Sequence, residues 1–306
     1  MIYKYFKSET DSLFTLINIP QEGCWIHVDE ASPEDLEVIS SYTGLSYADL
    51  HDTLDKYEVP RIEKVHNCIL IFIRYPTDQE SGLYTSTLTF ILTDTLFISI
   101  SPHASQLIRG FLTHTESTST FPQSTLLIQL LLRAIQEFTL QIKKIRHNVL
   151  KQEKEMISVE SEDITTLTKN EEILNQYLAS LEPFLNVLHT ITSGKYAHLC
   201  EKDQGLLEDL LNAVGQSKEL CGIVLKSIRN LRDAYQIIFT NNLHKTIKLL
   251  TALTIIFSIP TMIASLYGMN VQLPFSHSPN AFSLVLGWII LISIVGLIIF
   301  KRKRWL

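Results

Sequence analysis

Acidic residues are missing from the C-terminal part of the chain. No aspartate or glutamate follows Asp233, and after Lys248 the only charged residues form a basic cluster of Lys301, Arg302, Lys303 and Arg304. The whole chain has 26 Lys and Arg and 32 Asp and Glu, so removing these four bases leaves 22 against 32, about ten net negative charges, on residues 1–248. This balance favours cations as partners and argues against nucleic acid.

The sequence also lacks the motifs of common enzymes and cofactor sites. It has no phosphate-binding loop, no dinucleotide fingerprint, no H-E-x-x-H and no G-x-S-x-G, and no nucleophile, base and orienting group at a recognisable spacing. Its four cysteines lie far apart without a C-x-x-C pair, which predicts neither disulfides nor a zinc site (Cys24, Cys68, Cys200 and Cys221). We therefore expect neither an enzyme nor an organic cofactor.

Two long uncharged segments, residues 249–270 and 281–300, occupy the C-terminal part instead. Each is long enough to cross the hydrocarbon core of a bilayer. Lys245 and Lys248 precede the first segment, the basic cluster follows the second, and the loop between them has neither Lys nor Arg. The positive-inside rule then puts both termini in the cytoplasm, and the polar N-terminus lacks the apolar run of a signal peptide. We expect a multi-pass protein of the cell (inner) membrane, in contact with lipid.

Hydroxyl side chains in the first segment follow one helical stripe. Their spacing is 3, 4, 3 and 4 residues, and the positions between them are apolar apart from Pro260 (Thr251, Thr254, Ser258, Thr261 and Ser265). Packing against another helix is one interpretation of this stripe. The other is a water-lined path, which two spans per chain cannot enclose, so several copies would have to gather around it.

The N-terminal part predicts an α/β domain over residues 1–122, followed by long helices over residues 123–248. Short β-rich runs (CWIHV, CILIFIRY, SGLYTSTLTFILTD and TLFISISP) accompany two capped helical patterns, SPEDLEVISSYTG and SYADLHDTLDKY. Beyond them we expect a first transmembrane helix, an external loop, a second transmembrane helix and a basic cytoplasmic tail (residues 249–269, 270–280, 281–300 and 301–306).

Three helices are expected from residue 123 onward. A heptad stripe marks the first (Ile128, Leu131, Ile135, Phe138, Ile142, Ile145 and Val149). A leucine stripe marks the second, with an interruption near Pro183 and an end around Gly194 (Leu174, Leu178, Leu181, Leu185 and Leu188). From about Lys202 the helical pattern continues into the first membrane segment. A helix of about 65 residues would be roughly 100 Å long, which is typical of a stalk.

The end of the first membrane segment carries a specific motif. Tyr267 is followed by Gly268, Met269 and Asn270, then by a short loop, the second segment and the terminal KRKRWL. In this arrangement residues 241–306 resemble the CorA family of divalent-cation channels, and over the soluble part the resemblance rests on layout and on EVPRIE near Glu58. It implies an α/β cytoplasmic domain, long stalk helices and two C-terminal transmembrane helices in a funnel-shaped homopentamer. It also implies passive uptake of Mg²⁺, with Co²⁺ and Ni²⁺ as further candidates, through a pore that cytoplasmic divalent ions hold shut.

The same resemblance assigns roles to residues of the first membrane helix. It places Gly268, Met269 and Asn270 at a selective outer mouth, and on the pore face Ser265, Thr261, Ser258, Thr254, Leu250, Ile247 and His244. The stripe read from spacing agrees, except that it favours Thr251 over Leu250. Leu250 and Ile247 would form an apolar gate that excludes water. His244, at the inner mouth, departs from the family, where Asn is usual, and either senses pH or is uninvolved.

The outer mouth suits Mg²⁺ even without carboxylates. Mg²⁺ usually keeps several waters, and the amide oxygen of Asn270, one per copy, can accept hydrogen bonds from them. Gly268 allows the chain to turn at the helix end, where backbone carbonyls carry partial negative charge. Many family members have a Glu shortly after the motif, whereas the loop VQLPFSHSPN has none. Recruitment of the ion would therefore depend on Asn270 and the helix ends.

Counting back from the motif, the resemblance puts a regulatory carboxylate for Mg²⁺ at Glu208 and Asp209, although a charged pair on a long helix is also typical of a solvated face. Two alternatives to a Mg²⁺ channel stay open. One is a zinc transporter on the same scaffold, which ion competition would distinguish. The other is a non-conducting, membrane-anchored signalling protein, in which Asn270 would have no effect on ion flux.

Overall fold

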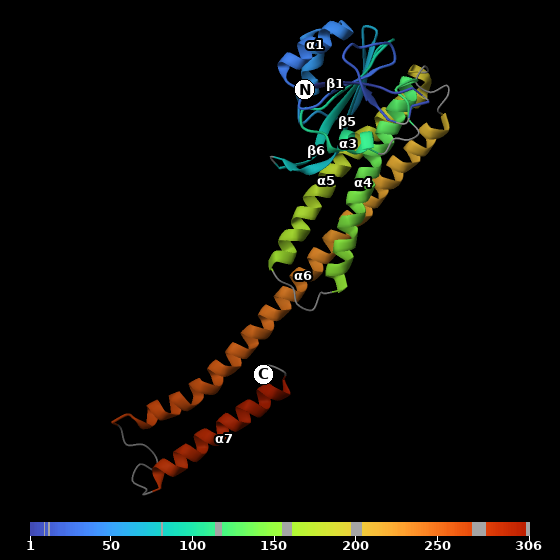
Figure 1. Ribbon diagram of the computed structural model, residues 1–306. Helices are drawn as coiled ribbons and strands as arrows, with labels where there is room; N and C mark the ends of the chain where they lie inside the picture. The colour runs from blue at the N-terminus through green and yellow to red at the C-terminus, as the bar shows by residue number, and fades with distance from the viewer. Residues whose placement is uncertain are drawn as a thin grey trace. The chain divides into compact units, whose positions relative to one another are not determined.

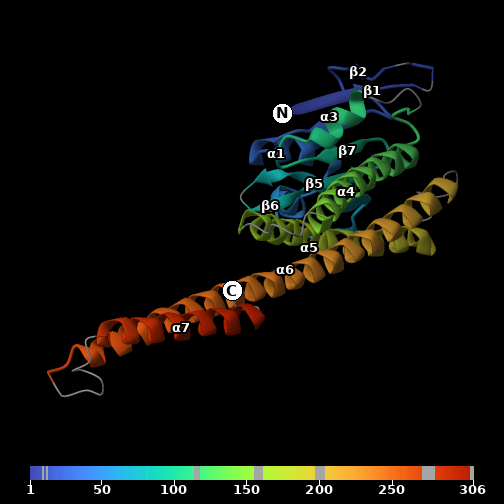
Figure 2. The same cartoon turned by 90° about the horizontal axis from the view of Figure 1, so that it is seen from below.

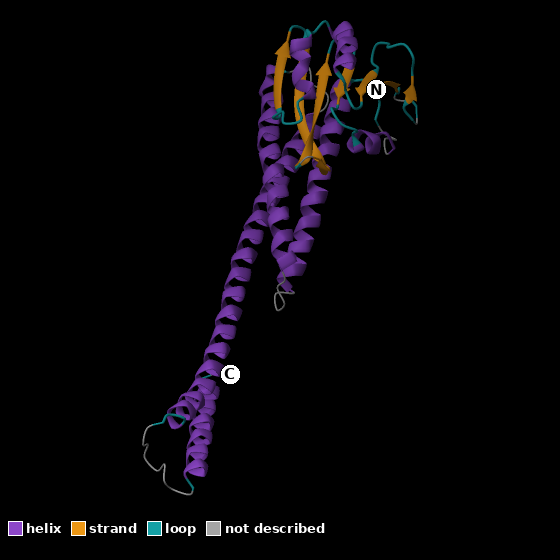
Figure 3. Ribbon diagram, turned by 90° about the vertical axis from the view of Figure 1, so that its left-hand side faces the viewer, coloured by secondary structure: helices purple, strands orange, loops and turns teal. Residues whose placement is uncertain are grey.

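The computed structural model describes residues 1–8, 10, 11, 13–80, 82–113, 118–154, 161–196, 204–270 and 280–303. They form two compact units, Met1–Leu231 and Arg232–Leu306. All strands among these residues belong to the first unit (Figure 3). Helix α6 (Gln204–Tyr267) contributes residues to both units (Figure 1).

A seven-stranded sheet organises the first unit. The strand order is β2-β1-β3-β7-β6-β5-β4, and every neighbouring pair is antiparallel except β3 and β7, which are parallel. The strands are β1 (Ile2–Phe6), β2 (Thr15–Leu16), β3 (Trp25–Val28), β4 (Arg61–Val65), β5 (Cys68–Glu80), β6 (Leu83–Leu92) and β7 (Phe97–Ile100). The four predicted strand regions are confirmed as β3, β5, β6 and β7, and with them the predicted α/β class.

Two short helices after β3 begin at capping boxes. In α1 (Pro33–Thr43) the Ser32 hydroxyl accepts from the backbone N–H of Asp35, and Gly44 ends the helix in the left-handed region at φ 72°. Ser46 caps α2 (Tyr47–His51) in the same way. The helix predicted for SYADLHDTLDKY is shorter than expected, because α2 passes into a 3₁₀ turn, η1 (Asp52–Leu54), before the chain turns toward β4.

The core lies on both faces of the sheet because successive strand residues point to opposite sides. On β3, Ile26 and Val28 join the cluster that packs against α1 and α2. Trp25, on the other face, lies 6.0 Å from the ring of Phe111 in α3 (Gln106–Thr113). Helices α4 (Gln123–Lys154) and α5 (Ser161–Thr190) cover that second face (Figure 2).

The stripe predicted for α4 is buried throughout, from Ile128 to Val149. The prediction for α5 is partly wrong, because the helix continues through Pro183 and passes into a short π-helix, η2 (Ile191–Lys195). Its buried stripe includes two aromatic residues, Tyr177 and Phe184, in place of the half-buried Leu178 and Leu185. Packing of these large side chains outweighs the cost of a proline inside the helix.

Two helices are long and apolar enough to cross a membrane, the 64-residue α6 and α7 (Ala281–Arg302). Pro260 lies inside α6 without ending it. Of the cysteines, Cys24, Cys68 and Cys221 are free and buried. Cys200, most of the predicted external loop and the last three residues lie outside the described residues.

Candidate functional site

The hydroxyl stripe of α6 is exposed in the single chain, and its hydroxyl groups donate hydrogen bonds to the backbone of the same helix. Four of the five hydroxyls donate to the backbone carbonyl four residues earlier: Thr251 to Ile247 at 2.8 Å, Thr254 to Leu250 at 2.9 Å, Ser258 to Thr254 at 2.6 Å, and Thr261 to Phe257 at 2.8 Å. A hydroxyl has one proton and two lone pairs. With its proton donated to the helix backbone, each of these four oxygens offers only acceptor capacity to its surroundings.

An acceptor stripe of this kind suits a ligand that presents hydrogen-bond donors. A hydrated cation does so, because its waters bind the ion through oxygen and direct their hydrogens outward. An anion would require donors, which these hydroxyls have already given to backbone carbonyls. The chemistry of the stripe therefore favours hydrated cations over anions.

A groove on the surface of α6 coincides with the C-terminal part of the stripe. It is lined by Thr254, Phe257, Ser258, Thr261, Met262 and Ser265. The four predicted pore-lining residues thus share one groove with Phe257 and Met262, which sequence reasoning did not single out. Both apolar side chains flank the stripe and are strongly exposed, at 68% and 65%.

The Gly-Met-Asn motif follows the last turn of α6. Gly268 donates its N–H to the carbonyls of Ala264 at 3.0 Å and Ser265 at 3.2 Å. Its φ is not in the left-handed region, and an added Cβ would lie 3.5 Å from the same two carbonyl oxygens, an ordinary contact. The backbone of one chain therefore does not require glycine here. Met269 and Asn270 are exposed just beyond it.

At the other end of the stripe, Leu250, Ile247 and His244 are all exposed in the single chain. Thr251 is exposed as well, and the groove includes neither Thr251 nor Leu250. Exposed leucine and isoleucine on adjacent turns provide the apolar surface that a gate would need.

The predicted regulatory residues Glu208 and Asp209 lie exposed on the first turns of α6, in the first unit. Within the described part of the chain, no group of three or more His, Cys, Asp or Glu residues could hold a metal ion. A regulatory site at Asp209 would therefore need ligands from another copy or from water.

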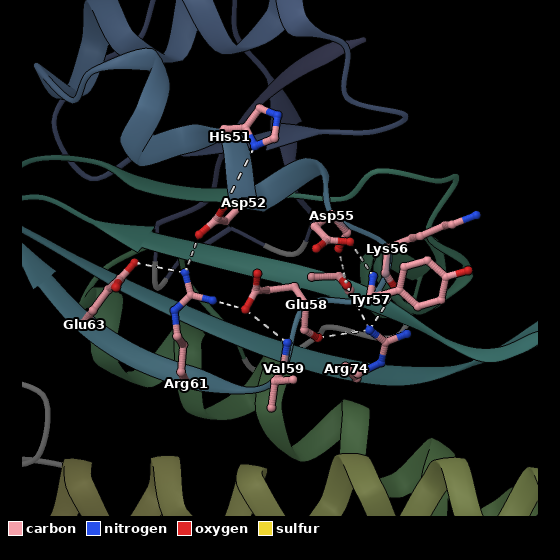
Figure 4. Close-up of polar contacts among 11 residues, drawn as sticks. His51, Asp52, Asp55, Lys56, Tyr57, Glu58, Val59, Arg61, Glu63 and Arg74 are labelled. Carbon is pink, nitrogen blue, oxygen red and sulfur yellow. Dashed lines mark hydrogen bonds and ion pairs between the residues drawn. The ribbon is translucent and has the colours of Figure 1, made fainter.

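A charged cluster that sequence reasoning missed surrounds Arg61, at the start of β4 (Figure 4). The guanidinium contacts the carboxylates of Glu58, Asp52 at 2.9 Å and Glu63 at 3.4 Å, and lies 4.0 Å from the centre of the Phe72 ring. From the sequence, the segment EVPRIE indicated only a likeness to the family and no charged cluster. Its alternation of carboxylates around one arginine was the available signal.

Arg74 holds the neighbouring turn against the sheet (Figure 4). This side chain is 7% exposed, and its Nη1 donates to the carbonyls of Lys56 at 2.8 Å and Glu58 at 3.0 Å. Nε and Nη2 donate to the hydroxyl and carbonyl of Thr85. Burial lowers the pKa of Arg74, but all of these acceptors stabilise the charged form. Arg74 thus fixes the loop that carries Glu58.

A Ser, His and Asp arrangement occurs in the sheet, but it is structural. Ser99 Oγ accepts from Trp25 Nε1 at 2.8 Å and lies 2.9 Å from His27 Nδ1, while His27 Nε2 lies 3.7 Å from Asp29 Oδ1. Ser99 and His27 are buried, at 0% and 3% exposed. No substrate can reach the serine, so this group stabilises the fold.

Asp29 connects this buried group to α3. Its Oδ1 accepts from the backbone N–H of Ser105 at 2.9 Å, and its Oδ2 accepts from Arg109 at 3.0 Å. Burial raises the pKa of Asp29, but contacts with His27, the Ser105 N–H and Arg109 outweigh it and hold the pKa well below its usual value.

Comparisons with known proteins agree with this architecture. The sequence profile described as "CorA-like Mg2+ transporter protein" matches residues 20–302. The "Cobalt/magnesium transport protein CorA" of Methanocaldococcus jannaschii is 25% identical over 297 residues, 92% of this chain and 91% of that protein. The complete CorA magnesium transporter structure from the same organism has a TM-score of 0.82 at 22% identity, covering 100% of this chain and 99% of the other.

A zinc-related neighbour is more distant. The cytoplasmic domain of ZntB from Vibrio parahaemolyticus has a TM-score of 0.64 at 12% identity, covering 78% of this chain and 98% of that domain. At this identity the likeness concerns the fold alone. The profile match, by contrast, covers nearly the whole sequence, including both apolar helices and the Gly-Met-Asn motif. The chain therefore belongs to the CorA-like Mg²⁺ transporter protein family, whose members are membrane transporters of divalent cations.

Proposed function

We propose that this protein is a homo-oligomeric channel for passive Mg²⁺ uptake, with α6 lining the pore. The observation that carries the proposal is the acceptor stripe of α6, in which four hydroxyl protons are bound to the helix and four oxygens face outward. Gathering several copies would bring these stripes around one axis and enclose a path for hydrated cations. Family membership supports a homopentamer with α7 on the lipid side.

Each end of the stripe has its own role in this proposal. At the outer mouth Asn270, positioned by Gly268 and Met269, accepts hydrogen bonds from the waters of Mg²⁺. Further in, Ser265, Thr261, Ser258 and Thr254 continue the contacts. Leu250 and Ile247 then narrow the path to an apolar gate.

The proposed arrangement in the cell follows from the charges around the spans. Both termini lie in the cytoplasm, the loop after Asn270 lies outside, and the membrane is the cell (inner) membrane. Divalent ions bound at Asp209 and Glu208, between copies, would hold the channel shut when cytoplasmic Mg²⁺ is high. Mg²⁺ is then both the transported and the regulatory ion.

The test is Mg²⁺ uptake into liposomes that contain the purified protein and a Mg²⁺ indicator, under an inside-negative potential. Asn270→Ala is compared with Asn280→Ala, a control at the start of α7 on the same side of the membrane. We expect uptake by the wild type and the control and its loss in Asn270→Ala. Equal uptake by all three would refute the role of Asn270, and no uptake by any assembled protein would refute the channel.

A further inference from the structure

The stripe on α6 extends beyond its hydroxyls toward the N-terminus of the helix. Two further positions, His244 and Ile247, precede Thr251 at spacings of 3 and 4, which is the same periodicity. Both are exposed, and they belong to the same unit as the rest of the stripe. Any path along the hydroxyls therefore passes His244 as well.

The His244 side chain is free to bind a ligand. Among the described residues it has no hydrogen bond or ion pair, and the same holds for Asn241, which lies three residues earlier and is also exposed. Residues three apart are neighbours on a helix surface. Each chain thus presents an imidazole nitrogen and an amide oxygen side by side.

Imidazole changes which ions the stripe can hold. From Ser265 to Thr251 its polar groups are hydroxyl oxygens, whereas His244 adds a nitrogen ligand. Imidazole suits Ni²⁺, Co²⁺, Cu²⁺ and Zn²⁺, whereas Mg²⁺ prefers carboxylate, carbonyl and water oxygens. A site built on His244 would distinguish transition-metal ions from Mg²⁺ by coordination chemistry.

Two lysines next to His244 increase the preference for transition-metal ions over Mg²⁺. Lys245 follows it directly and Lys248 lies one turn further along, and both are exposed. Their positive charges oppose any cation at this level of the helix. A hydrated Mg²⁺ ion gains nothing from imidazole to offset that repulsion, whereas an ion that coordinates nitrogen does.

We propose that His244 residues from several copies, with Asn241 as an auxiliary oxygen ligand, form a binding site for divalent transition-metal ions at the inner end of the path. The site rests on the proposed pore. Mg²⁺ passes it without coordination, whereas Ni²⁺ is retained, so the site departs from the Ni²⁺ uptake that the family resemblance implies. Retained Ni²⁺ occupies the path and blocks Mg²⁺ uptake.

The first test measures the Ni²⁺ concentration that halves Mg²⁺ uptake in liposomes containing the full-length protein. His244→Asn restores the residue usual in the family, and His147→Asn is the control, because His147 is an exposed histidine on α4. Loss of even a supporting group usually lowers metal affinity at least about tenfold. We therefore expect the half-blocking concentration to rise about tenfold or more in His244→Asn and to stay unchanged in the control.

A second readout separates this site from the channel itself. Binding of radioactive Ni²⁺ to the purified oligomer is measured in excess Mg²⁺, which saturates oxygen-based sites. A high-affinity Ni²⁺ site lost in His244→Asn but kept in His147→Asn supports the proposal even if flux is too low to measure. Equal Ni²⁺ binding and block in all three proteins, with Mg²⁺ uptake intact, overturns the His244 site and leaves the proposed channel standing. Absence of Mg²⁺ uptake with that site present overturns the channel alone.

Discussion

The direction of each hydroxyl proton determines what the stripe of α6 can bind. Serine and threonine inside helices often donate a hydrogen bond to a carbonyl of the preceding turn. On α6 these bonds leave a row of hydroxyl oxygens that can only accept hydrogen bonds. A valine keeps the shape of threonine but removes both the proton and the lone pairs. Substitutions of this kind separate the chemistry of the stripe from its packing.

We expect Thr254→Val and Thr261→Val to lower Mg²⁺ uptake by about fivefold or more, because each removes an acceptor worth about 1 kcal/mol to the hydrated ion. Thermal stability should change little, since both side chains are exposed in the single chain. Thr246→Val is the matched control: Thr246 donates to the Asn242 carbonyl at 3.0 Å but lies off the stripe. An equal loss of uptake in the control would contradict the assignment.

The buried Asp29 gives a second prediction, on stability and pH. Its folded pKa is lowered, so its contribution is present above the unfolded pKa of about 3.9 and is lost as the pH falls toward the folded pKa. Asp29→Asn should lower the free energy of unfolding by about 2 kcal/mol at pH 7. The difference from wild type should shrink below about pH 4. The difference in stability between Asp29→Asn and wild type is measured by thermal unfolding at several pH values, followed by tryptophan fluorescence, to which the neighbouring Trp25 contributes. A difference that does not depend on pH would contradict this role of Asp29.

Among the elements, long periodic helices were predictable and short edge strands were not. The seven-position stripe of α4 and the unbroken pattern of α6 each specify a helix over many turns. Strands β1, β2 and β4 lack such a signal because they are short, lie at or near the sheet edges and are at most half-buried. Their positions depend on pairing with β3 and β5, which local sequence does not contain.

Tertiary packing also explains where element predictions failed. Pro183 normally ends or bends a helix, but Leu181 and Phe184 beside it are buried completely, so α5 continues. In the candidate site the stripe and the motif could be found from spacing and resemblance. For the Arg61 cluster the only local signal was the alternation of charges in EVPRIE, and for Arg74 there was none, because both clusters join residues from η1, the loop before β4 and strands β4, β5 and β6.

Gly268, at the end of α6, is proposed to shape the outer mouth of the pore. Gly268→Val should leave thermal unfolding nearly unchanged, because the φ of Gly268 is not in the left-handed region and an added Cβ would make only ordinary contacts at 3.5 Å. Mg²⁺ uptake should fall, because larger side chains from several copies would crowd the outer mouth. Gly44→Ala is the contrasting variant, since its φ of 72° should cost roughly 1 kcal/mol of stability without affecting the pore. Full uptake by Gly268→Val would remove Gly268 from the proposed mouth.

At the level of the whole molecule, α6 would link the proposed regulatory site to the proposed pore. The same helix carries Asp209 near its start and the stripe near its end. An ion bound at Asp209, as proposed, would therefore act on the same helix that lines the proposed pore. The proposed assembly of copies could not be specified from a single sequence, because the face of α6 that would meet other copies is exposed in one chain.

Asp209→Lys tests the proposed feedback. With a lysine in place of the carboxylate, internal Mg²⁺ should no longer inhibit uptake, because the ion loses a ligand and meets a positive charge. The measurement is Mg²⁺ influx at increasing internal Mg²⁺ concentration. Glu219→Lys, which also replaces a carboxylate on α6 by a lysine, is the control for the change in charge. Unchanged inhibition in Asp209→Lys would remove Asp209 from the regulatory site.

In the proposed channel, the hydroxyl face of α6 lines a water-filled path. The most direct measurement places cysteines on this face and on the opposite one, Ser258→Cys and Ile256→Cys, two residues apart on the same helix. A small, positively charged thiol reagent is then applied during Mg²⁺ uptake, with wild type as the control for the native cysteines. We predict rapid block of Ser258→Cys and continued uptake by Ile256→Cys and wild type. Block of Ile256→Cys with Ser258→Cys unaffected would show that the hydroxyl face does not line the path.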